Sequence, residues 1–189
     1  TTGHTWKYLD NGSNQGTAWR ATAFNDAAWA SGPSPLGYGG DGEATELSFG
    51  GDTQNKHATT YYRTTIEIPD PTVFLNFLLR VKYDDGAAVY INGVERFRQN
   101  IGNNAGFNDY ANGTVSDEGG WKDATIPVSA LVAGTNTIAV EVHQASGTSS
   151  ATRMDLPLRG QTTAVGGGGD NFADPFTLYQ PTLIRARAY

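Results

Sequence analysis

The chain has 189 residues, of which 24 are glycines, and its formal net charge at pH 7 is −6. This length suits one domain with short additions and is sufficient to bury a core. The acidic balance argues against a nucleic-acid partner, whose phosphates need a basic surface. No run of about 18 apolar residues is present, so we expect no membrane insertion.

The chain contains no cysteine. Disulfides, thiolate metal sites and cysteine nucleophiles are therefore excluded. The first residues do not have the pattern of a signal peptide, and we expect the sequence to be a segment of a longer protein.

The first forty residues predict one strand and several core aromatics. Residues 6–9 alternate between large apolar and polar side chains, as in a half-buried strand. We expect Trp19 and Trp29 to pack in the core, because large aromatic side chains dominate burial in β-sandwiches. Residues 25–29 predict one helical turn, which Asn25 and Asp26 can cap.

Residues 37–56 lack a periodic pattern and predict the first long loop. Loops of more than about 12–15 residues inside a compact domain are usually functional or disordered. The glycines let backbone carbonyls turn inward, and carboxylates are the hard ligands that Ca²⁺ prefers. We therefore predict a structural calcium site at Asp41, Glu43 and Asp52. A solvated acidic loop without a metal is the alternative.

The centre of the chain predicts antiparallel strands joined by tight turns. Asn92-Gly93 is the strongest short-range hairpin signal, because a type I′ turn needs positive φ at both residues. Asp84-Asp85-Gly86 interrupts the alternation upstream of it. We interpret 75–97 as an antiparallel meander, which indicates a sandwich or a barrel. The predicted strands in this part are 61–68, 75–83, 87–91 and 94–97.

A second long irregular region, 99–120, is rich in Asn and Gly and precedes Trp121. Three more strands are predicted after it, at 122–128, 137–143 and 152–158. We divide the chain into a β-sandwich (1–160), a Gly-rich linker (161–171) and a C-terminal strand segment (172–189). The last segment resembles the start of a chitobiase-type immunoglobulin-like module, which would be truncated here.

Three stretches carry a resemblance to a known family: "YYRTTIEIPDP", "YDDGAAVYINGVERFR" and "LVAGTNTIAVEVHQ". In this order they resemble the galactose-binding-like jelly-roll domain, which occurs as the sugar-binding domain of family-2 glycosidases. A closer form is an accessory module of large secreted bacterial proteins. The resemblance implies an all-β, antiparallel jelly-roll β-sandwich and a secreted or cell-surface bacterial location.

Alternate connections of an antiparallel meander lie at the same end. The long loops, the Asp84-Asp85-Gly86 turn and the loop after His143 should therefore converge, and binding residues concentrate on such loops. Aromatic rings, amides and charged groups at this end suit sugars, and the resemblance also implies sugar binding there. The predicted ligand-binding residues are Tyr38, His57, Arg98, Asn100, Phe107, Tyr110, Trp121, His143 and Gln144.

Catalysis by this chain is disfavoured. Paired carboxylates must face each other across about 5–10 Å, whereas Asp84 and Asp85 are adjacent in a tight turn, where we expect Asp85 to point inward and hold a loop. Only three histidines are present, and there is no GxSxG nucleophile motif. We expect His143 to bond locally or to touch a ligand.

These observations favour a non-catalytic carbohydrate-binding module, tethered to the other domains of a secreted polysaccharide-active protein. Its expected partner is a polysaccharide or an oligosaccharide. A structural or adhesion module of a cell-surface protein without a sugar site is the alternative. A small lyase or hydrolase is a third, weaker hypothesis.

Overall fold

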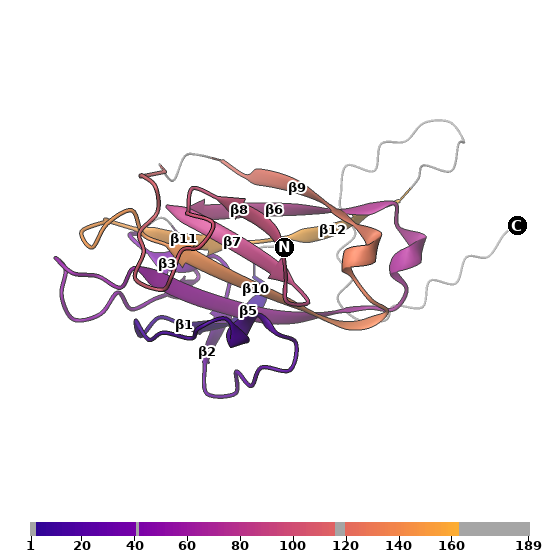
Figure 1. Cartoon of the computed structure of the whole chain (residues 1–189), viewed down its shortest axis with the longest axis horizontal. Helices are drawn as coiled ribbons and strands as arrows, with labels where there is room; N and C mark the ends of the chain where they lie inside the picture. Colours follow the sequence, from indigo (N-terminus) through magenta and orange to yellow (C-terminus); the bar gives the residue numbers. More distant parts are fainter. Residues whose placement is uncertain (1–2, 41, 116–119, 163–189) are drawn as a thin grey trace, which may run out of the picture.

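The computed structural model describes residues 3–40, 42–115 and 120–162. In these ranges the chain forms twelve β-strands and short 3-10 turns, arranged as an elongated all-β domain (Figure 1). Two sheets with predominantly antiparallel pairing make up the domain, so the predicted antiparallel β-sandwich is confirmed. Among the described residues, no helix has the length and apolar character needed to cross a membrane.

The first sheet has six strands in the order β2-β1-β5-β10-β7-β8. Its centre is the long pair of β5 and β10, which match over ten residues from Ile68↔Gly134 to Thr59↔His143. The strands of this sheet are β1 (Thr5–Leu9), β2 (Ala30–Pro33), β5 (Thr59–Ile68), β7 (Gly86–Ile91), β8 (Val94–Gln99) and β10 (Gly134–His143).

The second sheet is centred on β6, which pairs with β9 along one edge and with β11 and then β12 along the other. The next strand after β11 is β3, and β4 joins β3 in the one parallel pairing described. The strands of this sheet are β3 (Leu36–Tyr38), β4 (Thr45–Glu46), β6 (Asn76–Asp84), β9 (Lys122–Pro127), β11 (Thr152–Asp155) and β12 (Leu158–Gln161).

The hairpin prediction at Asn92-Gly93 is confirmed, since φ is 51° at Asn92 and 82° at Gly93. The continuous meander over 75–97 is wrong. β6 and β7 lie in different sheets, and the chain crosses between the sheets at Asp85. Alternation cannot reveal this crossing, because both strands keep one apolar side toward the shared core.

Two further differences concern short elements. Residues 37–56, predicted to be irregular, contain the end of β3 and the two-residue strand β4, while the upstream strand β2 was also missed. The predicted helical turn at 25–29 is a hydrogen-bonded turn, closed by Trp29 N donating to Asp26 O at 3.0 Å. Strands of two to four residues are too short to show a period.

The main core lies between the two sheets and is built from their inward-facing side chains, such as Tyr62, Leu79 and Val140. A second cluster covers the outer face of the first sheet, with Trp19 and Trp29 packed on Tyr61. The two tryptophans are 0% and 7% exposed, which confirms their predicted packing. Because both of its faces are covered, β7 is buried along its whole length.

The connections divide into two groups at opposite ends of the sandwich (Figure 1). The loop end comprises, among the described residues, 10–17, 47–58, Asp85, 100–115, 120–121 and 144–151. The turn end comprises 69–75 with the 3-10 turn η2 (Pro71–Val73), the hairpin 92–93, and 128–133 with the 3-10 turn η4 (Val128–Ala130). A third such turn, η1 (Ala18–Arg20), carries Trp19.

The predicted linker, 161–171, begins inside β12, whose last residue is Gln161. Residues 163–171 of that linker and the predicted strand segment 172–189 lie outside the described residues.

Candidate functional site

The loops of the loop end are tied to one another by backbone hydrogen bonds. Lys56 N donates to Gly147 O at 2.9 Å, Gln144 N to Ala58 O at 2.9 Å, and Ala111 N to Gln144 O at 2.8 Å. The segments before β5, after β8 and after β10 are therefore in contact, so the predicted convergence of these loops is confirmed.

Asp85 joins the same loops through its carboxylate. The side chain is 3% exposed, and it accepts hydrogen bonds from Val115 N at 2.9 Å, Ala145 N at 2.7 Å and Ser149 Oγ at 3.3 Å. This confirms the expectation that Asp85 points inward and holds a loop. A depression of about 270 Å³ lies beside it, with hydroxyl side chains of the two loops in its wall.

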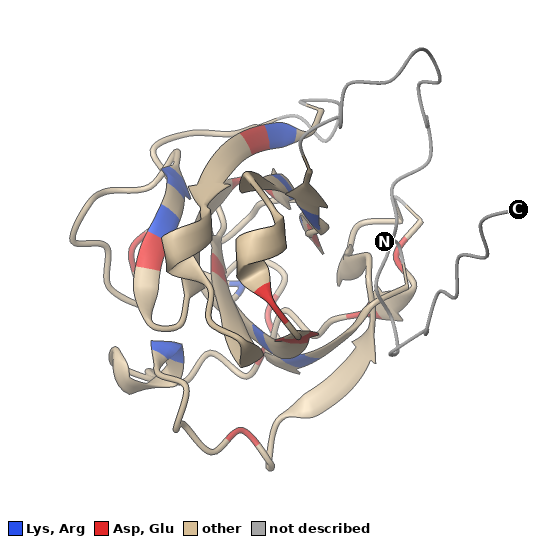
Figure 2. Ribbon diagram, turned by 90° about the vertical axis from the view of Figure 1, so that its right-hand side faces the viewer, with Lys and Arg blue, Asp and Glu red and all other residues tan. Residues whose placement is uncertain are grey.

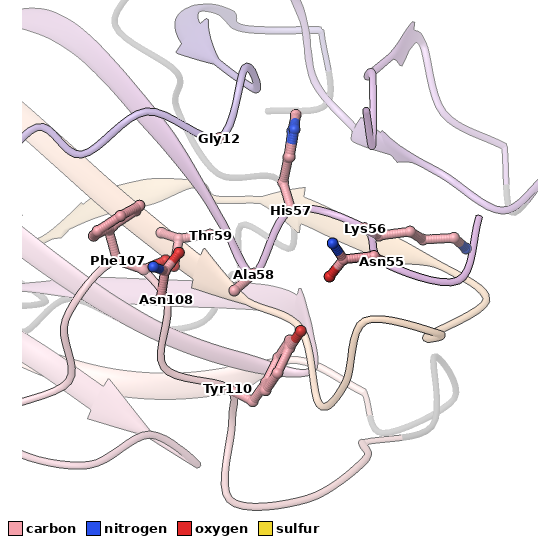
Figure 3. A pocket seen from close by; sticks show the side chains of 9 residues that line it. All are labelled: Gly12, Asn55, Lys56, His57, Ala58, Thr59, Phe107, Asn108 and Tyr110. Carbon is pink, nitrogen blue, oxygen red and sulfur yellow. The ribbon is translucent and has the colours of Figure 1, made fainter. Parts of the chain in front are cut away.

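A larger pocket of about 350 Å³ opens at the loop end (Figure 3). It lies between the segment that leads into β5 and the loop that follows β8. Its lining residues are Gly12, Asn55, Lys56, His57, Ala58, Thr59, Phe107, Asn108 and Tyr110. Of the nine predicted ligand-binding residues, three line this pocket: His57, Phe107 and Tyr110.

The aromatic residues of the pocket come from one loop. Tyr110 is 41% exposed, whereas Phe107 is partly buried against the second cluster. The backbone of Phe107 is fixed to the start of β5, because Thr59 Oγ1 donates to Phe107 O at 2.8 Å. The loop thus presents an exposed ring from a backbone that the sheet holds in place.

His57 forms the upper wall of the pocket in Figure 3 and is held between two loops. Its Nδ1–H donates to Asp10 O at 2.8 Å. A Cβ at Gly12 would lie 2.5 Å from the imidazole ring, and a Cβ at Gly50 would lie 2.8 Å from it. Both glycines have positive φ, so the ring occupies space that only glycine leaves free.

The Lys56 ammonium group does not point into the pocket. Its side chain extends away from the pocket in Figure 3, and Nζ donates to Ser149 O. Nζ also lies 5.1 Å from the ring centroid of Tyr38 and 5.0 Å from that of Phe49, within reach of a cation–π interaction. Lys56 therefore lines the pocket but binds the neighbouring loop.

Three predicted ligand-binding residues are interior residues instead. Tyr38, His143 and Gln144 are 7%, 0% and 4% exposed, respectively. Burial first, and then the charges of Asp84 and Asp85, raise the pKa of Tyr38 to about 12. Their burial has one physical cause: the loops cover both the strand ends and the core, so residues at these ends become enclosed.

Arg98 and Asn100 support the loops and do not line the pocket. The Arg98 guanidinium donates to the Glu95 carboxylate at 2.7 Å and to Tyr90 Oη at 2.9 Å. Asn100 has φ 57°, and its Nδ2 donates to Asp85 O at 3.0 Å and to Gly113 O at 2.7 Å. Both side chains are thereby engaged within the protein.

Trp121 also lies outside the pocket. It precedes β9 in the second sheet and is 37% exposed. Arg80 Cζ lies 5.5 Å from its ring centroid, and the Arg80 guanidinium pairs with Asp123 at 2.8 Å. The ring therefore stacks on a strand of its own sheet.

His143 is part of a buried polar network on the outer face of the first sheet. Its Nδ1 lies 2.7 Å from Asp109 O, and its Nε2 lies 3.6 Å from Glu141 Oε2. Tyr90 Oη donates to Glu141 Oε1 at 2.7 Å, and Arg20 lies 3.4 Å from the same oxygen.

The Glu141 carboxyl is almost fully buried, and burial alone would raise its pKa. The hydrogen bond that Tyr90 donates, the His143 ring 3.6 Å from Oε2 and the positive charge of Arg20 together outweigh burial. They hold the pKa of Glu141 below its ordinary value of 4.5. The network therefore keeps a carboxylate charged inside the fold.

The three residues of the predicted calcium site are not seen together in the described part of the chain. Asp41 lies outside the described residues, Glu43 is partly buried, and Asp52 is exposed, its carboxylate accepting from Gln54 N at 2.8 Å. In the described ranges, no three His, Cys, Asp or Glu side chains are grouped so that they could hold a metal. The calcium site stays a prediction.

Sequence reasoning missed the polar residues that surround the three predicted ones in the pocket. Asn108 lies between Phe107 and Tyr110 in the chain, and Asn55 lies two residues before His57. The signal that would have found them is this adjacency, because amides flanking exposed aromatic residues in a loop are available to the same ligand.

No protein-family model matches the sequence, and no curated protein matches it. The fold, in contrast, is similar to parts of several solved enzymes. A β-glucuronidase 2 of Bacteroides uniformis is 20% identical with a TM-score of 0.52, and the match covers 81% of this chain and 17% of that chain. This chain shares its fold with one part of that glycosidase.

Two further structures give the same result. A β-glycosidase from Bacteroides vulgatus is 18% identical with a TM-score of 0.50, covering 82% of this chain and 19% of that chain. Another Bacteroides uniformis β-glucuronidase is 22% identical with a TM-score of 0.50, covering 77% and 14%. This chain spans less than a fifth of the length of each. At such low identity the likeness concerns the fold alone.

Proposed function

We propose that this chain is a non-catalytic carbohydrate-binding domain of a larger polysaccharide-active protein, and that a sugar binds in the pocket at the loop end. The observation that carries the proposal is the pocket itself. The exposed ring of Tyr110 stands beside the side-chain amides of Asn55 and Asn108, in a depression of about 350 Å³.

These residue types match the chemistry of a sugar. The C–H face of a pyranose packs on an aromatic ring, and its hydroxyls pair with groups that both donate and accept. An amide offers one acceptor and two donor hydrogens in a plane. The volume is near the lower limit of about 300–1,000 Å³ for small-molecule sites. It suits one or a few sugar residues rather than a long polymer segment.

The scaffold supports the pocket without needing to rearrange. Thr59 is the first residue of β5, one of the two ten-residue strands in the first sheet, and its hydroxyl donates to the Phe107 carbonyl. Lys56 N and Gly147 O connect the loop before β5 to the loop after β10. A site on such fixed segments loses less conformational entropy on binding.

The lining also favours binding over hydrolysis. Glycoside hydrolysis usually needs two carboxyl groups about 5–10 Å apart. Among the described residues that line the pocket there is no Asp or Glu. In the neighbouring depression, both carboxylate oxygens of Asp85 already accept hydrogen bonds from the loops.

The comparisons support an accessory role by analogy of fold. The match covers less than a fifth of the length of the glycosidases. A domain of this kind is tethered to other domains and carries them to a glycan. We extend the proposal to a secreted or cell-surface protein, where polysaccharides are encountered.

The proposal is tested by affinity electrophoresis and calorimetric titration against a panel of plant and algal polysaccharides and their oligosaccharides. We expect weak binding to at least one glycan. Tyr110→Ala and Asn108→Ala should each lower that affinity about tenfold, because losing a stacking ring or an amide contact removes about 1.4 kcal/mol. Trp121→Ala is the matched control: it removes a ring of similar exposure outside the pocket.

A panel without any bound glycan would contradict the proposal. Equal losses of glycan affinity in Tyr110→Ala and Trp121→Ala would also contradict it, because they would show that the binding site is not in this pocket. Melting temperatures of all variants must stay near that of the parent, because the two exposed rings contribute little to the core.

A further inference from the structure

The turn end of the sandwich exposes apolar side chains on two neighbouring connections. Val73 and Leu75 follow β5, and Val132 follows η4; their exposures are 60%, 59% and 54%. Scattered apolar residues on a surface are ordinary, but these three are gathered at one end. We call Val73, Leu75 and Val132 the apolar patch.

The two connections that carry the patch lie side by side. Figure 2 views this end, and the turns η2 and η4 are adjacent there, as they are at the right of Figure 1. The register agrees, because Ile68 at the end of β5 pairs with Gly134 at the start of β10. In residues 69–75 and 128–134, Asp70 is the one charged residue.

The described chain ends directly beside the patch. Leu75 N donates to Gln161 O at 2.8 Å, and a Cβ at Gly160 would lie 2.4 Å from the Phe74 ring. Residues beyond Thr162 therefore begin at the turn end, next to Leu75 and far from the pocket. Whatever those residues bind, the patch is the first apolar surface within reach.

The sequence after this point has two parts. Residues 163–171 include four consecutive glycines, and residues 172–189 contain Phe172, Phe176, Leu178 and Leu183 together with two arginines. For a Gly-rich linker, nine residues correspond to an average end-to-end distance of roughly 5–6 Å × √9, or about 15–18 Å. This length is sufficient for the apolar residues of 172–189 to reach the patch.

We propose that the apolar patch is an intramolecular docking surface for the segment 172–189 of the same chain. The tether supports this occupant, because short flexible linkers give effective concentrations in the millimolar range. A contact too weak to form between separate molecules is then substantially occupied within one. The arginines of the segment also complement Asp70, the charge at the edge of the patch.

The test uses the full 189-residue chain and exploits its lack of cysteine. A nitroxide spin label on a single introduced cysteine, Thr177→Cys, leaves the apolar residues of the segment intact. Amide resonances are compared before and after chemical reduction of the label. We expect Val73, Leu75 and Val132 to lose about half of their intensity or more, as a contact of millimolar strength is about half occupied at this effective concentration.

A matched pair of charge substitutions locates the contact. Val132→Glu should abolish the broadening. Trp121→Glu should leave it unchanged, because Trp121 is also exposed, at 37%, but lies at the loop end, the opposite end of the sandwich. Both side chains are substantially exposed, so neither change threatens the fold.

Three results would overturn the proposal. They are the absence of broadening at the patch, broadening that persists in Val132→Glu, and broadening that weakens on dilution. The last would identify a second copy of the chain as the occupant. Glycan binding at the pocket is independent of each outcome.

Discussion

The loop end and the turn end are built from the same strands, yet a different kind of buried polar group organises each. At the loop end, the carboxylate of Asp85 accepts hydrogen bonds from the two loops that follow β8 and β10. At the turn end, the amide of Asn136 accepts from Val132 N and Asn92 Nδ2 and donates to Val132 O and Gly134 O. Both side chains are buried.

The difference follows from what each group can pair with. A carboxylate only accepts, so Asp85 collects N–H and O–H groups from long segments that have no partner strand. An amide both donates and accepts, so Asn136 closes a compact turn by itself. Long loops can vary around one anchor and form a pocket, whereas compact turns leave little besides their apolar side chains exposed.

The largest effect is expected from breaking the loop-end anchor. Asp85→Ala leaves the partly buried amides of Val115 and Ala145 without their acceptor. We expect the free energy of unfolding to fall by about 3–5 kcal/mol, as for a broken buried charged network. At about 2–4 °C per kcal/mol, the melting temperature falls by roughly 10 °C. Asp85→Asn retains one acceptor oxygen, so its melting temperature should lie between those of the parent and of Asp85→Ala.

The buried network around Glu141 should make the free energy of unfolding depend on pH in the acid range. The pKa of Glu141 in the folded protein lies below the ordinary value of 4.5. The stabilisation from its carboxylate is therefore complete above pH 4.5 and is lost as the pH falls through the folded-state pKa. Glu141→Gln should cost about 2–3 kcal/mol at pH 7. It should also flatten the decline in stability below pH 4.5. Denaturant unfolding at a series of pH values measures both effects, and an unchanged acid slope in the variant would contradict the assignment.

Breaking the turn-end anchor should cost less and leave binding intact. Asn136→Ala leaves Val132 N without its acceptor but exposes no charge. We expect a loss of about 1–3 kcal/mol in unfolding free energy. Glycan affinity at the pocket should match that of the parent, because the anchor belongs to the opposite end. A parallel loss of affinity would show that the two ends are coupled.

The smallest expected effect separates backbone strain from the His57 contact. Gly12 and Gly16 share one loop, and both have positive φ. A Cβ at Gly12 would collide with the His57 ring, whereas a Cβ at Gly16 would meet no atom within 4 Å. Gly16→Ala should cost about 1 kcal/mol through its φ alone. Gly12→Ala should cost about 1 kcal/mol more and also weaken glycan binding, because the ring must move. If the two variants had the same unfolding free energy and the same glycan affinity, the contact between Gly12 and the His57 ring would have no role in shaping the pocket.

The sequence predicted most strongly where a single interaction determines the local structure. The Asn92-Gly93 turn and the strands between Thr59 and His143 follow from local φ preferences and alternation, and the structure has them nearly as expected. The predicted strand 152–158 is instead two strands, β11 and β12, separated by residues 156–157. The inward Asp85 was also predicted, because a carboxylate in a tight turn between two strands has loop amides within reach.

The residues of the pocket were harder to predict, for a physical reason. Periodicity gives the side of a strand on which a residue lies, but not whether a loop covers that side. His143 ends a strand at the predicted end, yet it is fully buried beneath the loop that follows β8. Trp121 looked equally suitable by residue type but lies on the edge of the other sheet. Loop paths depend on long-range contacts, and the sequence carries no local pattern for them.

One strand sets the distance between the two ends. β5 begins at Thr59, in the wall of the pocket, and ends at Ile68, directly before the 69–75 connection, which contacts Gln161. Ten residues at about 3.3 Å each make a stiff rod of roughly 30 Å. A glycan bound in the proposed site would be held at that distance from Gln161, where the described chain reaches the turn end. The proposed binding site and the last described strand end therefore lie at opposite ends of the sandwich, and the paired strands β5 and β10 fix their separation.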